Sequence, residues 1–454
     1  MFRRVLIANR GEVAVRIIRA CRELGIETIA VYSTADRDSL HTRMADRAVH
    51  IGPPLPAESY LRIPSLVAAA TTTECDAVHP GWGFLAENAA FALACEDNDL
   101  VFIGPRPETI ETMGDKIAAK TAMAAAGVPL VPGSDGAVDL EEAREIATEI
   151  GFPILLKAPA GGGGRGMRLV EYAEDLEASY RTASSEAQSA FGDGSLYVEK
   201  AVVGARHVEI QVLGDGEGAV LTLGERDCSI QRRHQKLVEE SPSPAVTSEI
   251  RAEMEGAAKR ACEALRYLGA GTIEFLLDAD GRFYFIEMNT RLQVEHPVTE
   301  LVTGIDLAHA QLAVAAGDGL PAEGRVELRG HAVEFRINAE DPADDFKPAP
   351  GRVTRFRPPL GPGVRVDTHV EEGYSIPPFY DSLIAKVIVW GEDREVALAR
   401  GRRALDELEL DGVPTTRELA LDIVSSSEFA RGDYTTSFLA DAARSLESLR
   451  GGAA

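Results

Sequence analysis

Cysteines, aromatic residues and long apolar runs are all scarce in this sequence. The five cysteines are scattered and none forms a CxxC pair, so neither a zinc ribbon nor a dithiol redox motif is indicated. The first residues, MFRRVLIANR, lack the apolar stretch of a signal peptide, and no run is long enough to span a membrane. These absences predict a cytoplasmic protein with reduced thiols.

Basic residues are also few. The chain has 47 Lys and Arg against 72 Asp and Glu, which gives a formal net charge of −25. A surface that binds nucleic acid or an anionic membrane needs a basic face, so we expect neither partner. An anionic small substrate remains compatible, because a pocket can be basic on an acidic protein. With 454 residues, 45% of them hydrophobic, the chain is long enough for two or three domains.

Strand and helix patterns alternate in the N-terminal part of the chain. Residues 3–9 and 27–33 have the apolar character of strands, and residues 12–25 have that of an amphipathic helix ending in glycine. This order predicts a doubly wound, Rossmann-like α/β domain. The first turn, ANRGEVA, lacks the GxGxxG pattern, so we expect no dinucleotide site there.

Changes of pattern divide the chain into three predicted domains. We expect an N-terminal domain over residues 1–113 and a central domain over 114–328, with a mobile lid at about 131–203. The strands and helices of residues 329–447 predict a C-terminal α+β domain, and residues 448–454 predict a flexible tail.

A run of glycines, GGGGRGM at residues 161–167, follows a predicted strand that carries Lys157. Glycine lets backbone N–H groups approach phosphate oxygens, and a nearby lysine adds a positive charge for the same oxygens. The spacing differs from that of a P-loop. A flexible hinge or lid with no ligand fits the same residues, and a mobile loop over phosphates fits both interpretations.

Two carboxylates and an amide fall on neighbouring strands of one predicted hairpin. Glu274 and Glu287 lie close to facing positions, and Asn289 lies two residues further along the same face of an extended chain. These oxygens suit a hard divalent cation, and Mg²⁺ with nucleotide phosphates is the expected ligand. Charges paired with arginines on a surface hairpin are the alternative. Because Glu287 follows an apolar strand, we expect a buried carboxylate that needs a partner.

Polar residues continue at every second position after this hairpin. Arg291 offers a planar fork for a bicarbonate-like anion, and Glu295 beside it is a candidate general base. Arg336, on another predicted strand, is a candidate second cation for the same site. A salt-bridged loop is the alternative interpretation of these residues.

The segment ERDCSIQRRHQK is rich in cations on an acidic protein, which indicates a nearby anion. It carries Gln231, His234 and Lys236. A lone histidine is usually structural, so His207 and His234 are weak ligand candidates when each is taken singly. No histidines or cysteines have metal-ligand spacing, so zinc is not expected.

Taken in order, these motifs resemble the biotin carboxylase family, which has the ATP-grasp fold. The resemblance covers essentially the whole chain and rests on VLIANRGEVAVRIIRACRELG, HPGWGFLAEN, FIGP, MGDK, GGGGRGM, ERDCSIQRRHQK, FIEMNTRLQVEHPVTE and GHAVEFRINAEDP. The segment EMNTR…QVEHPVTE separates this family from other ATP-grasp ligases. Trp82 stands where the family commonly has tyrosine, which keeps an aromatic ring and loses a hydroxyl.

The resemblance implies a two-step reaction. Bicarbonate is phosphorylated by MgATP to carboxyphosphate, and N1 of biotin is then carboxylated. The implied cofactors are ATP and two Mg²⁺ or Mn²⁺ ions. Biotin is implied as a carrier-bound substrate that is not attached to this chain.

The family's functional residues carry over to matching positions of this sequence. The implied catalytic residues are Lys236, Arg291, Glu295, which deprotonates bicarbonate, and Arg336, which steadies the biotin enolate. The implied ATP contacts are Lys116, Lys157, the lid glycines Gly163 and Gly164, the adenine-reading strand Glu199, Lys200, Ala201 and Val202, and His207, Gln231, His234, Glu274 and Glu287. The implied bicarbonate contacts are Lys236, Arg291, Gln293 and Val294; biotin would contact Arg336 and Trp82; the metal ligands would be Glu274, Glu287 and Asn289.

Partners also follow from the resemblance. The sequence has no Met-Lys-Met biotinylation turn and no room for a carboxyltransferase, so a separate biotin carboxyl carrier protein and carboxyltransferase subunits are implied. The implied acceptor is acetyl-CoA or another acyl-CoA, as in fatty-acid synthesis. Arg16, Arg19 and Glu23 resemble the family's dimer contact, which implies a homodimer.

Two other functions fit parts of the pattern. A different ATP-grasp ligase, of the purine-pathway or carbamoyl-phosphate type, also pairs two carboxylates and an asparagine on Mg²⁺, but QVEHPVTE and EFRINAEDP argue against it. A non-catalytic subunit that kept the fold predicts a broken set of site residues, whereas the implied catalytic and metal residues are all present.

Overall fold

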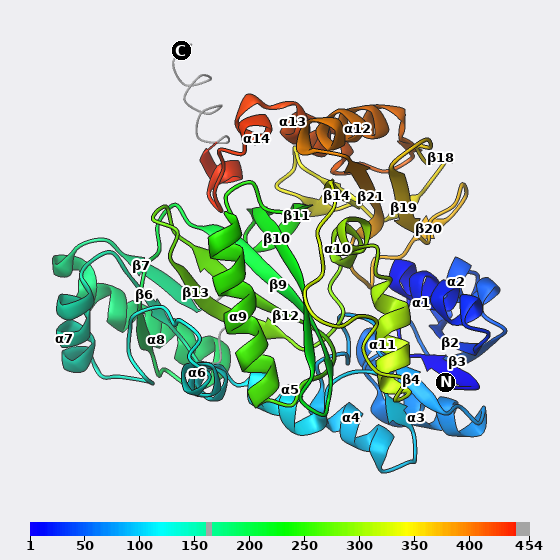
Figure 1. Cartoon of the computed structure of the whole chain (residues 1–454), viewed down its shortest axis with the longest axis horizontal. Helices are drawn as coiled ribbons and strands as arrows, with labels where there is room; N and C mark the ends of the chain where they lie inside the picture. Colours follow the sequence, from blue (N-terminus) through cyan, green and yellow to red (C-terminus); the bar gives the residue numbers. More distant parts are fainter. Residues whose placement is uncertain (160–165, 442–454) are drawn as a thin grey trace.

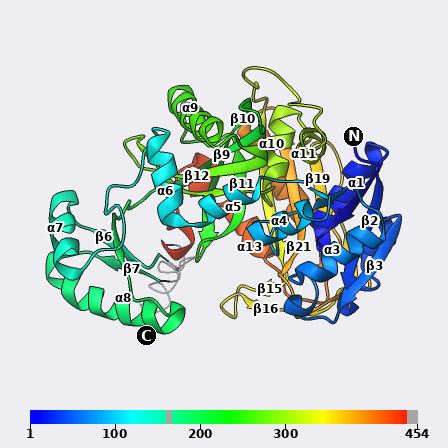
Figure 2. The same ribbon diagram turned by 90° about the horizontal axis from the view of Figure 1, so that it is seen from below.

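A large central sheet dominates the computed structural model, which describes residues 1–159 and 166–441. The N-terminal part of the chain lies at one side of this sheet, and a small lobe projects from the other side (Figures 1 and 2). Gly163, Gly164 and the predicted tail 448–454 lie outside the described residues. None of the described helices is both long and apolar enough to cross a membrane.

The N-terminal part forms a parallel five-stranded sheet in the order β3-β2-β1-β4-β5, as expected for a doubly wound domain. Its first helix buries an apolar stripe of Val13, Ala14, Ile17, Ile18 and Cys21, which has helical spacing. The strands are β1 (Arg4–Ile7), β2 (Glu27–Ser33), β3 (Arg47–Gly52), β4 (Ala77–His79) and β5 (Val101–Phe102). The helices are α1 (Gly11–Glu23), α2 (Leu40–Met44), α3 (Ile63–Thr72), α4 (Ala89–Glu96) and α5 (Pro107–Gly114).

The projecting lobe is a three-stranded antiparallel sheet, in the order β7-β6-β8, covered by two helices. It has its own core, in which Ile154, Leu156 and Val198 of the sheet pack on Ala147 and Ala183 of the helices. Its elements are α7 (Leu140–Ile150), β6 (Ile154–Lys157), β7 (Met167–Val170), α8 (Leu176–Phe191) and β8 (Tyr197–Lys200), and α6 (Lys116–Ala125) precedes them. The lobe falls within the predicted lid.

The central sheet has eight antiparallel strands in the order β13-β12-β9-β10-β11-β14-β21-β19. Apolar residues of α9, such as Met254 and Ala261, pack on Ile210 and Phe275 of the sheet. The strands are β9 (Arg206–Asp215), β10 (Val220–Arg232), β11 (Gln235–Ser241), β12 (Leu268–Leu277), β13 (Phe283–Asn289), β14 (His331–Asn338), β19 (Val364–Thr368) and β21 (Leu383–Gly391). The helices beside it are α9 (Ser248–Ala264), α10 (His296–Thr303) and α11 (Leu307–Ala315).

This sheet crosses the predicted boundary between residues 328 and 329, because β14 pairs with β11 along Val238↔Phe335 to Ser241↔Ala332. The two segments therefore share one sheet, and the three domain ranges remain predictions. The rest of the C-terminal segment consists of β15 (Glu340–Asp341), β16 (Lys347–Pro348), β17 (Gly351–Arg352), β18 (Arg355–Arg357), β20 (Ser375–Ile376), α12 (Arg394–Glu407), β22 (Glu409–Asp411), α13 (Arg417–Ser425) and α14 (Ser427–Arg431).

Candidate active site

Three glutamates stand in one rung of the central sheet. Glu274 on β12 is the cross-strand partner of Glu209 on β9 and of Glu287 on β13. Lys236, on β11, reaches two of them: its Nζ lies 2.6 Å from Glu209 Oε2 and 2.8 Å from Glu274 Oε1. Like charges directly opposite one another destabilise a sheet. Lys236 offsets part of that repulsion, on the side of the rung away from Glu287.

Glu287 is exposed, so the expectation of a buried carboxylate was wrong. The reason is a bulge. Phe275 pairs with Phe285 and the next residue, Glu274, pairs with Glu287, which leaves Ile286 as an extra residue on β13. The bulge turns Glu287 away from the buried face of Phe285. Partial desolvation of the carboxylate and, after it, the charge of Glu274 raise the pKa of Glu287.

Asn289 lies beside the same rung. Its Nδ2 donates to Glu274 Oε1 at 2.7 Å, and its Oδ1 accepts from Arg291 Nη2 at 2.9 Å. A divalent cation between Glu274 and Glu287 would need the amide to turn over and present its oxygen. The donor set, two carboxylates and an amide with one carboxylate facing solvent, is the chemistry that Mg²⁺ takes in proteins.

Glu295 is fully buried and held between two cations. Its Oε1 lies 2.7 Å from Lys236 Nζ, and its Oε2 accepts from Arg336 Nη2 at 2.9 Å. Burial alone would raise the pKa of Glu295, but Lys236 and Arg336 hold it well below its usual range. The carboxylate is therefore ionised and able to accept a proton once an arriving anion shares these cations.

Arg291 and Gln293 complete this end of the site. Arg291 Nε donates to Glu87 Oε2 at 2.8 Å, and its Nη1 donates to Gln293 Oε1 at 2.9 Å. Gln293 is buried, and its amide nitrogen lies 3.5 Å from Glu274 Oε1. The alternating residues that follow the hairpin thus lie around Lys236 and the three glutamates that it contacts, Glu209, Glu274 and Glu295, which we call the Lys236 cluster.

A second group of cations lies at the lobe. Lys157, at the end of β6, and Lys120, on α6, both pair with Glu199 on β8. Burial would raise the pKa of Glu199, but the two lysines lower it. Lys116 is the first residue of α6, and burial followed by the charge of Lys157 lowers its pKa. The predicted phosphate contacts Lys116 and Lys157 thus lie near the Glu199 carboxylate, where their binding of ATP stays a prediction.

The other predicted nucleotide residues occupy several places. His207 is buried on β9 with its Nε2 2.9 Å from Glu274 Oε2. His234 is exposed in the β10–β11 turn, and Gln231 pairs with Lys236 across that hairpin. Lys200 points away from the Glu199 cluster, because its Nζ donates to the carbonyls of Gly151 and Phe152 at 3.0 Å each. Ala201, which is buried, and Val202, which is half-buried, follow β8.

Trp82 packs in the N-terminal part of the chain rather than against the Lys236 cluster. Its indole Nε1 donates to Glu12 Oε1 at 3.2 Å, and its ring packs against the N-terminal core around Val13 and Ile17. Its predicted contact with biotin stays a prediction.

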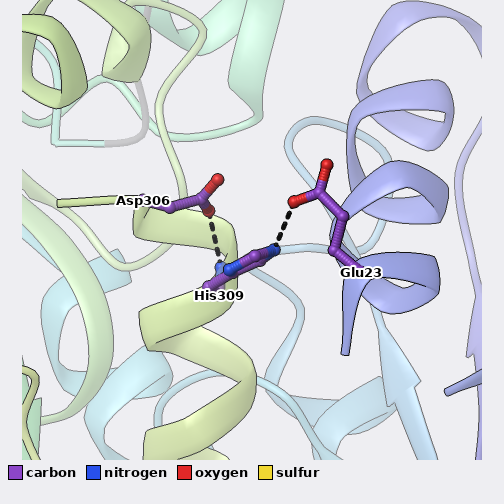
Figure 3. A group of neighbouring side chains, drawn as sticks. All are labelled: Glu23, Asp306 and His309. Atoms are coloured by element: carbon purple, nitrogen blue, oxygen red, sulfur yellow. Dashed lines mark hydrogen bonds and ion pairs between the residues drawn. The ribbon is translucent and has the colours of Figure 1, made fainter. Parts of the chain in front are cut away.

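Three groups of described residues bring metal-capable atoms within 4.8 Å of one another. Two of them, His207–Glu209–Glu274 and Glu209–Cys228–Glu295, overlap the Lys236 cluster. Figure 3 shows the third, where Glu23 of α1 meets Asp306 and His309 at α11. There Asp306 caps the His309 N–H at 2.8 Å and pairs with Arg16 at 2.7 Å, and His309 Nε2 lies 3.0 Å from Glu23. This third group acts as an ion-paired contact between the two helices.

Several residues of the site were missed from the sequence. Glu209 carried a usable signal, because His207, Glu209 and Gln211 alternate along one strand face. Lys120 did too, since it lies one helical turn after Lys116. Glu87 and Glu239 carried none. They reach Arg291 and Arg336 from distant parts of the chain.

Family models match almost the whole chain. The match to "Biotin carboxylase, N-terminal domain" covers residues 1–110, that to "Carbamoyl-phosphate synthase L chain, ATP binding domain" covers 115–323, and that to "Biotin carboxylase C-terminal domain" covers 334–441.

Known proteins resemble the chain over nearly its full length. A biotin carboxylase of Nostoc sp. is 56% identical over 440 residues, which is 96% of this chain and 98% of the relative. A biotin carboxylase of Campylobacter jejuni, solved as a β-γ-ATP complex, is 49% identical with a TM-score of 0.93 and covers 97% of this chain and 99% of its own. The biotin carboxylase domain dimer of Hydrogenobacter thermophilus 2-oxoglutarate carboxylase, solved with MgADP, ADP and bicarbonate, is 49% identical with a TM-score of 0.91 and covers 97% and 98%.

Proposed function

This chain belongs to the biotin carboxylase family, and from that premise we propose how its own residues carry out the MgATP-dependent carboxylation of biotin by bicarbonate. The observation that carries the assignment is the buried Glu295, held by Lys236 and Arg336 beside the Glu274–Glu287 pair. A carboxylate that could accept a proton, cations that could bind an anion and carboxylates that could bind a divalent cation support this proposal, because a ligase that phosphorylates bicarbonate with MgATP needs all three.

Bicarbonate binds at the cations of this cluster. Arg291 and Lys236 supply positive charge, and Gln293 and Val294 supply hydrogen-bonding groups on the same turn. An anion that shares Lys236 weakens the hold of that lysine on Glu295, so the proton affinity of Glu295 rises when bicarbonate arrives. Glu295 then takes the bicarbonate proton as general base.

ATP binds between the lobe and the central sheet. Lys116 and Lys157 contact its phosphates, together with the predicted contacts Gly163 and Gly164, which lie outside the described residues, and Glu199 to Val202 read the adenine. His207, Gln231 and His234 line the same pocket. Mg²⁺ or Mn²⁺, held by Glu274, Glu287 and Asn289, supplies the charge that lets two anions approach each other.

The reaction proceeds in two steps, after which Glu295 releases the bicarbonate proton to solvent. A bicarbonate oxygen bonds to the γ-phosphorus as the bond to the ADP oxygen breaks, which yields carboxyphosphate. Carboxyphosphate releases CO₂ and phosphate, the phosphate takes the N1 proton of biotin, and N1 bonds to the CO₂ carbon. Arg336 stabilises the biotin enolate in between, and closure of the lobe excludes water from the labile intermediate.

We propose that this chain acts together with other proteins. Biotin is carried on a separate biotin carboxyl carrier protein, and carboxyltransferase subunits pass the carboxyl group to acetyl-CoA or another acyl-CoA in the cytoplasm. The chain works as a homodimer, with Arg19 and Glu23 of α1 at the contact; Arg16, which is also predicted there, is buried against Glu300 and Asp306 of its own chain and would support the contact from behind. Assaying the purified chain and carrier with carboxyltransferases of different acceptor type identifies the acceptor.

ADP release by the purified chain tests the assignment as a whole. We expect release to require Mg²⁺ and bicarbonate and to increase when free biotin or a biotinylated carrier domain is added. Turnover with bicarbonate that neither form of biotin accelerates would overturn the biotin assignment, and turnover without bicarbonate would overturn the bicarbonate assignment.

A further inference from the structure

One rung of the central sheet holds the segment that carries Glu295. Arg336 on β14, Lys386 on β21 and Asp367 on β19 are successive cross-strand partners, so their side chains share one face. Arg336 donates to Glu295, as described above. Lys386, next to it in the rung, donates to the preceding residue: its Nζ lies 2.7 Å from the Val294 carbonyl oxygen. Neighbouring cations of the sheet thus hold neighbouring residues of the turn.

Lys386 is fully buried, which is unusual for lysine. Burial alone would lower its pKa, but Glu12, followed by Glu334 and Asp367, raises it, so the ammonium stays charged. Glu12 Oε1 lies 3.4 Å and Asp367 Oδ2 lies 3.9 Å from Nζ. These pairs are longer than the contact with Val294, so the backbone carbonyl is the nearest of these three partners.

The carbonyl of Val294 and the N–H of Glu295 belong to one planar peptide unit. A cation that holds the carbonyl therefore sets the orientation of the whole unit, and with it the start of the Glu295 side chain. Gln293 precedes this unit and α10 follows it, where Arg365 Nη1 and Arg16 Nη2 hold Glu300 at 2.6 and 2.8 Å. Lys386 holds the Val294–Glu295 peptide unit, whereas the preceding carbonyl, that of Gln293, lies 2.7 Å from His296 Nδ1 of the same turn.

We propose that Lys386 is a positioning residue for the reaction: through the Val294 carbonyl it fixes the turn that presents Gln293 to bicarbonate and Glu295 to Lys236 and Arg336. This inference rests on the proposed function, which assigns Gln293–Glu295 to bicarbonate. Among residues 1–159 and 166–441, Lys386 forms no hydrogen bond or ion pair with the Lys157–Glu199 group, so its effect falls on bicarbonate rather than on ATP.

Lys386→Met tests the proposal, because methionine fills similar space without charge or donor. It also leaves Glu12 buried beside no ammonium, so we add Lys386→Met with Glu12→Gln, which removes both charges. In both we expect kcat/KM for bicarbonate to fall on the order of 10- to 100-fold, with KM for ATP within about twofold of wild type. Lys386→Arg keeps charge and donors and is expected to lose less than Lys386→Met.

A matched control separates positioning from stability. Arg394 also pairs with a buried glutamate, Glu240, on the α12 side of the sheet. Arg394→Met is expected to lower the melting temperature and leave KM for bicarbonate unchanged. A bicarbonate kcat/KM that is wild-type in the double variant, an ATP KM that rises by as much as the bicarbonate kcat/KM falls, or equal losses in Lys386→Arg and Lys386→Met would overturn the proposal.

Glu295→Gln, assayed in parallel, distinguishes failure of the positioning role of Lys386 from failure of the proposed function. If Glu295→Gln is inactive while the Lys386 double variant is normal, only the positioning role fails. If Glu295→Gln keeps bicarbonate-dependent turnover, the proposed base itself fails.

Discussion

Glu274 and Glu287 face each other directly across β12 and β13. Glu209 stands on the other side of Glu274, and Lys236 is shared by Glu209 and Glu274. Lys236 offsets the charge at one end of this row, and Glu287 at the other end is exposed. The proposed divalent cation would bind at the exposed end, on the side away from Lys236.

Glu287→Gln is expected to separate metal binding from folding. Removing this carboxylate relieves its repulsion with Glu274, so the melting temperature without Mg²⁺ should rise slightly. The added stability from saturating MgADP, about 2.7 kcal/mol at 100 times Kd, should largely disappear. Thermal melts with and without MgADP check this, beside Glu263→Gln on the exposed face of α9 as control. A full MgADP shift in Glu287→Gln would contradict the metal assignment.

Lys236→Gln is expected to destabilise the protein by about 3 kcal/mol, because three glutamates lose their shared cation. Adding Glu209→Gln removes one of those charges and should recover part of the stability without restoring turnover. Denaturant unfolding and ADP release measure the two effects. Recovery of turnover in the double variant would show that Lys236 acts only on the fold.

The Glu239 carboxyl is expected to make the stability of the protein depend on pH. Burial raises the pKa of Glu239 to about 7, and Glu295 adds to the rise against the opposing effect of Arg336. A carboxyl whose pKa is higher in the folded than in the unfolded chain stabilises most at low pH, and that stability is lost as pH rises toward 7. Glu239→Gln mimics the protonated form, so relative to wild type it should gain stability between pH 5 and pH 7.5. Melting temperatures of both proteins across this range check the sign. A variant that loses stability relative to wild type as pH rises would contradict the prediction.

Lys157→Gln is expected to raise KM for ATP about 10-fold, the cost of one charge-assisted hydrogen bond. KM for bicarbonate should change little. Lys259→Gln is the matched control, because Lys259 is half-exposed on α9 and pairs only loosely with Glu263 at 3.9 Å. Initial-rate kinetics with each substrate varied in turn decide it, and equal changes in the two KM values would exclude a specific phosphate contact.

The hairpin geometry could be predicted because its signals are local. Alternation placed Glu274 opposite Glu287, and the structure confirms that pairing. The bulge at Ile286 could not be predicted, since FYFIEM contains no glycine or proline to mark it. That single extra residue decides that Glu287 is exposed rather than buried.

The contacts of the Lys236 cluster could not be predicted from local sequence patterns. The segment ERDCSIQRRHQK indicated cations near an anion, but the contacts of Lys236 with Glu209 and Glu274 depend on which strands become neighbours in the sheet. Lys386 lies about 90 residues from Val294 along the chain, and only the folded sheet brings the two together. Strand order is a property of the whole chain, so contacts between distant residues such as these could not be predicted from local sequence patterns.

Transfer of labelled bicarbonate to biotin by wild type and by Glu295→Gln tests the central claim most directly. We expect label in carboxybiotin with wild type, and a loss of at least about 100-fold in the variant, as for removal of a general base. The folded structure of the variant, checked by its melting temperature, should persist because glutamine still accepts from Arg336. Carboxybiotin formed at the wild-type rate by Glu295→Gln would contradict the account.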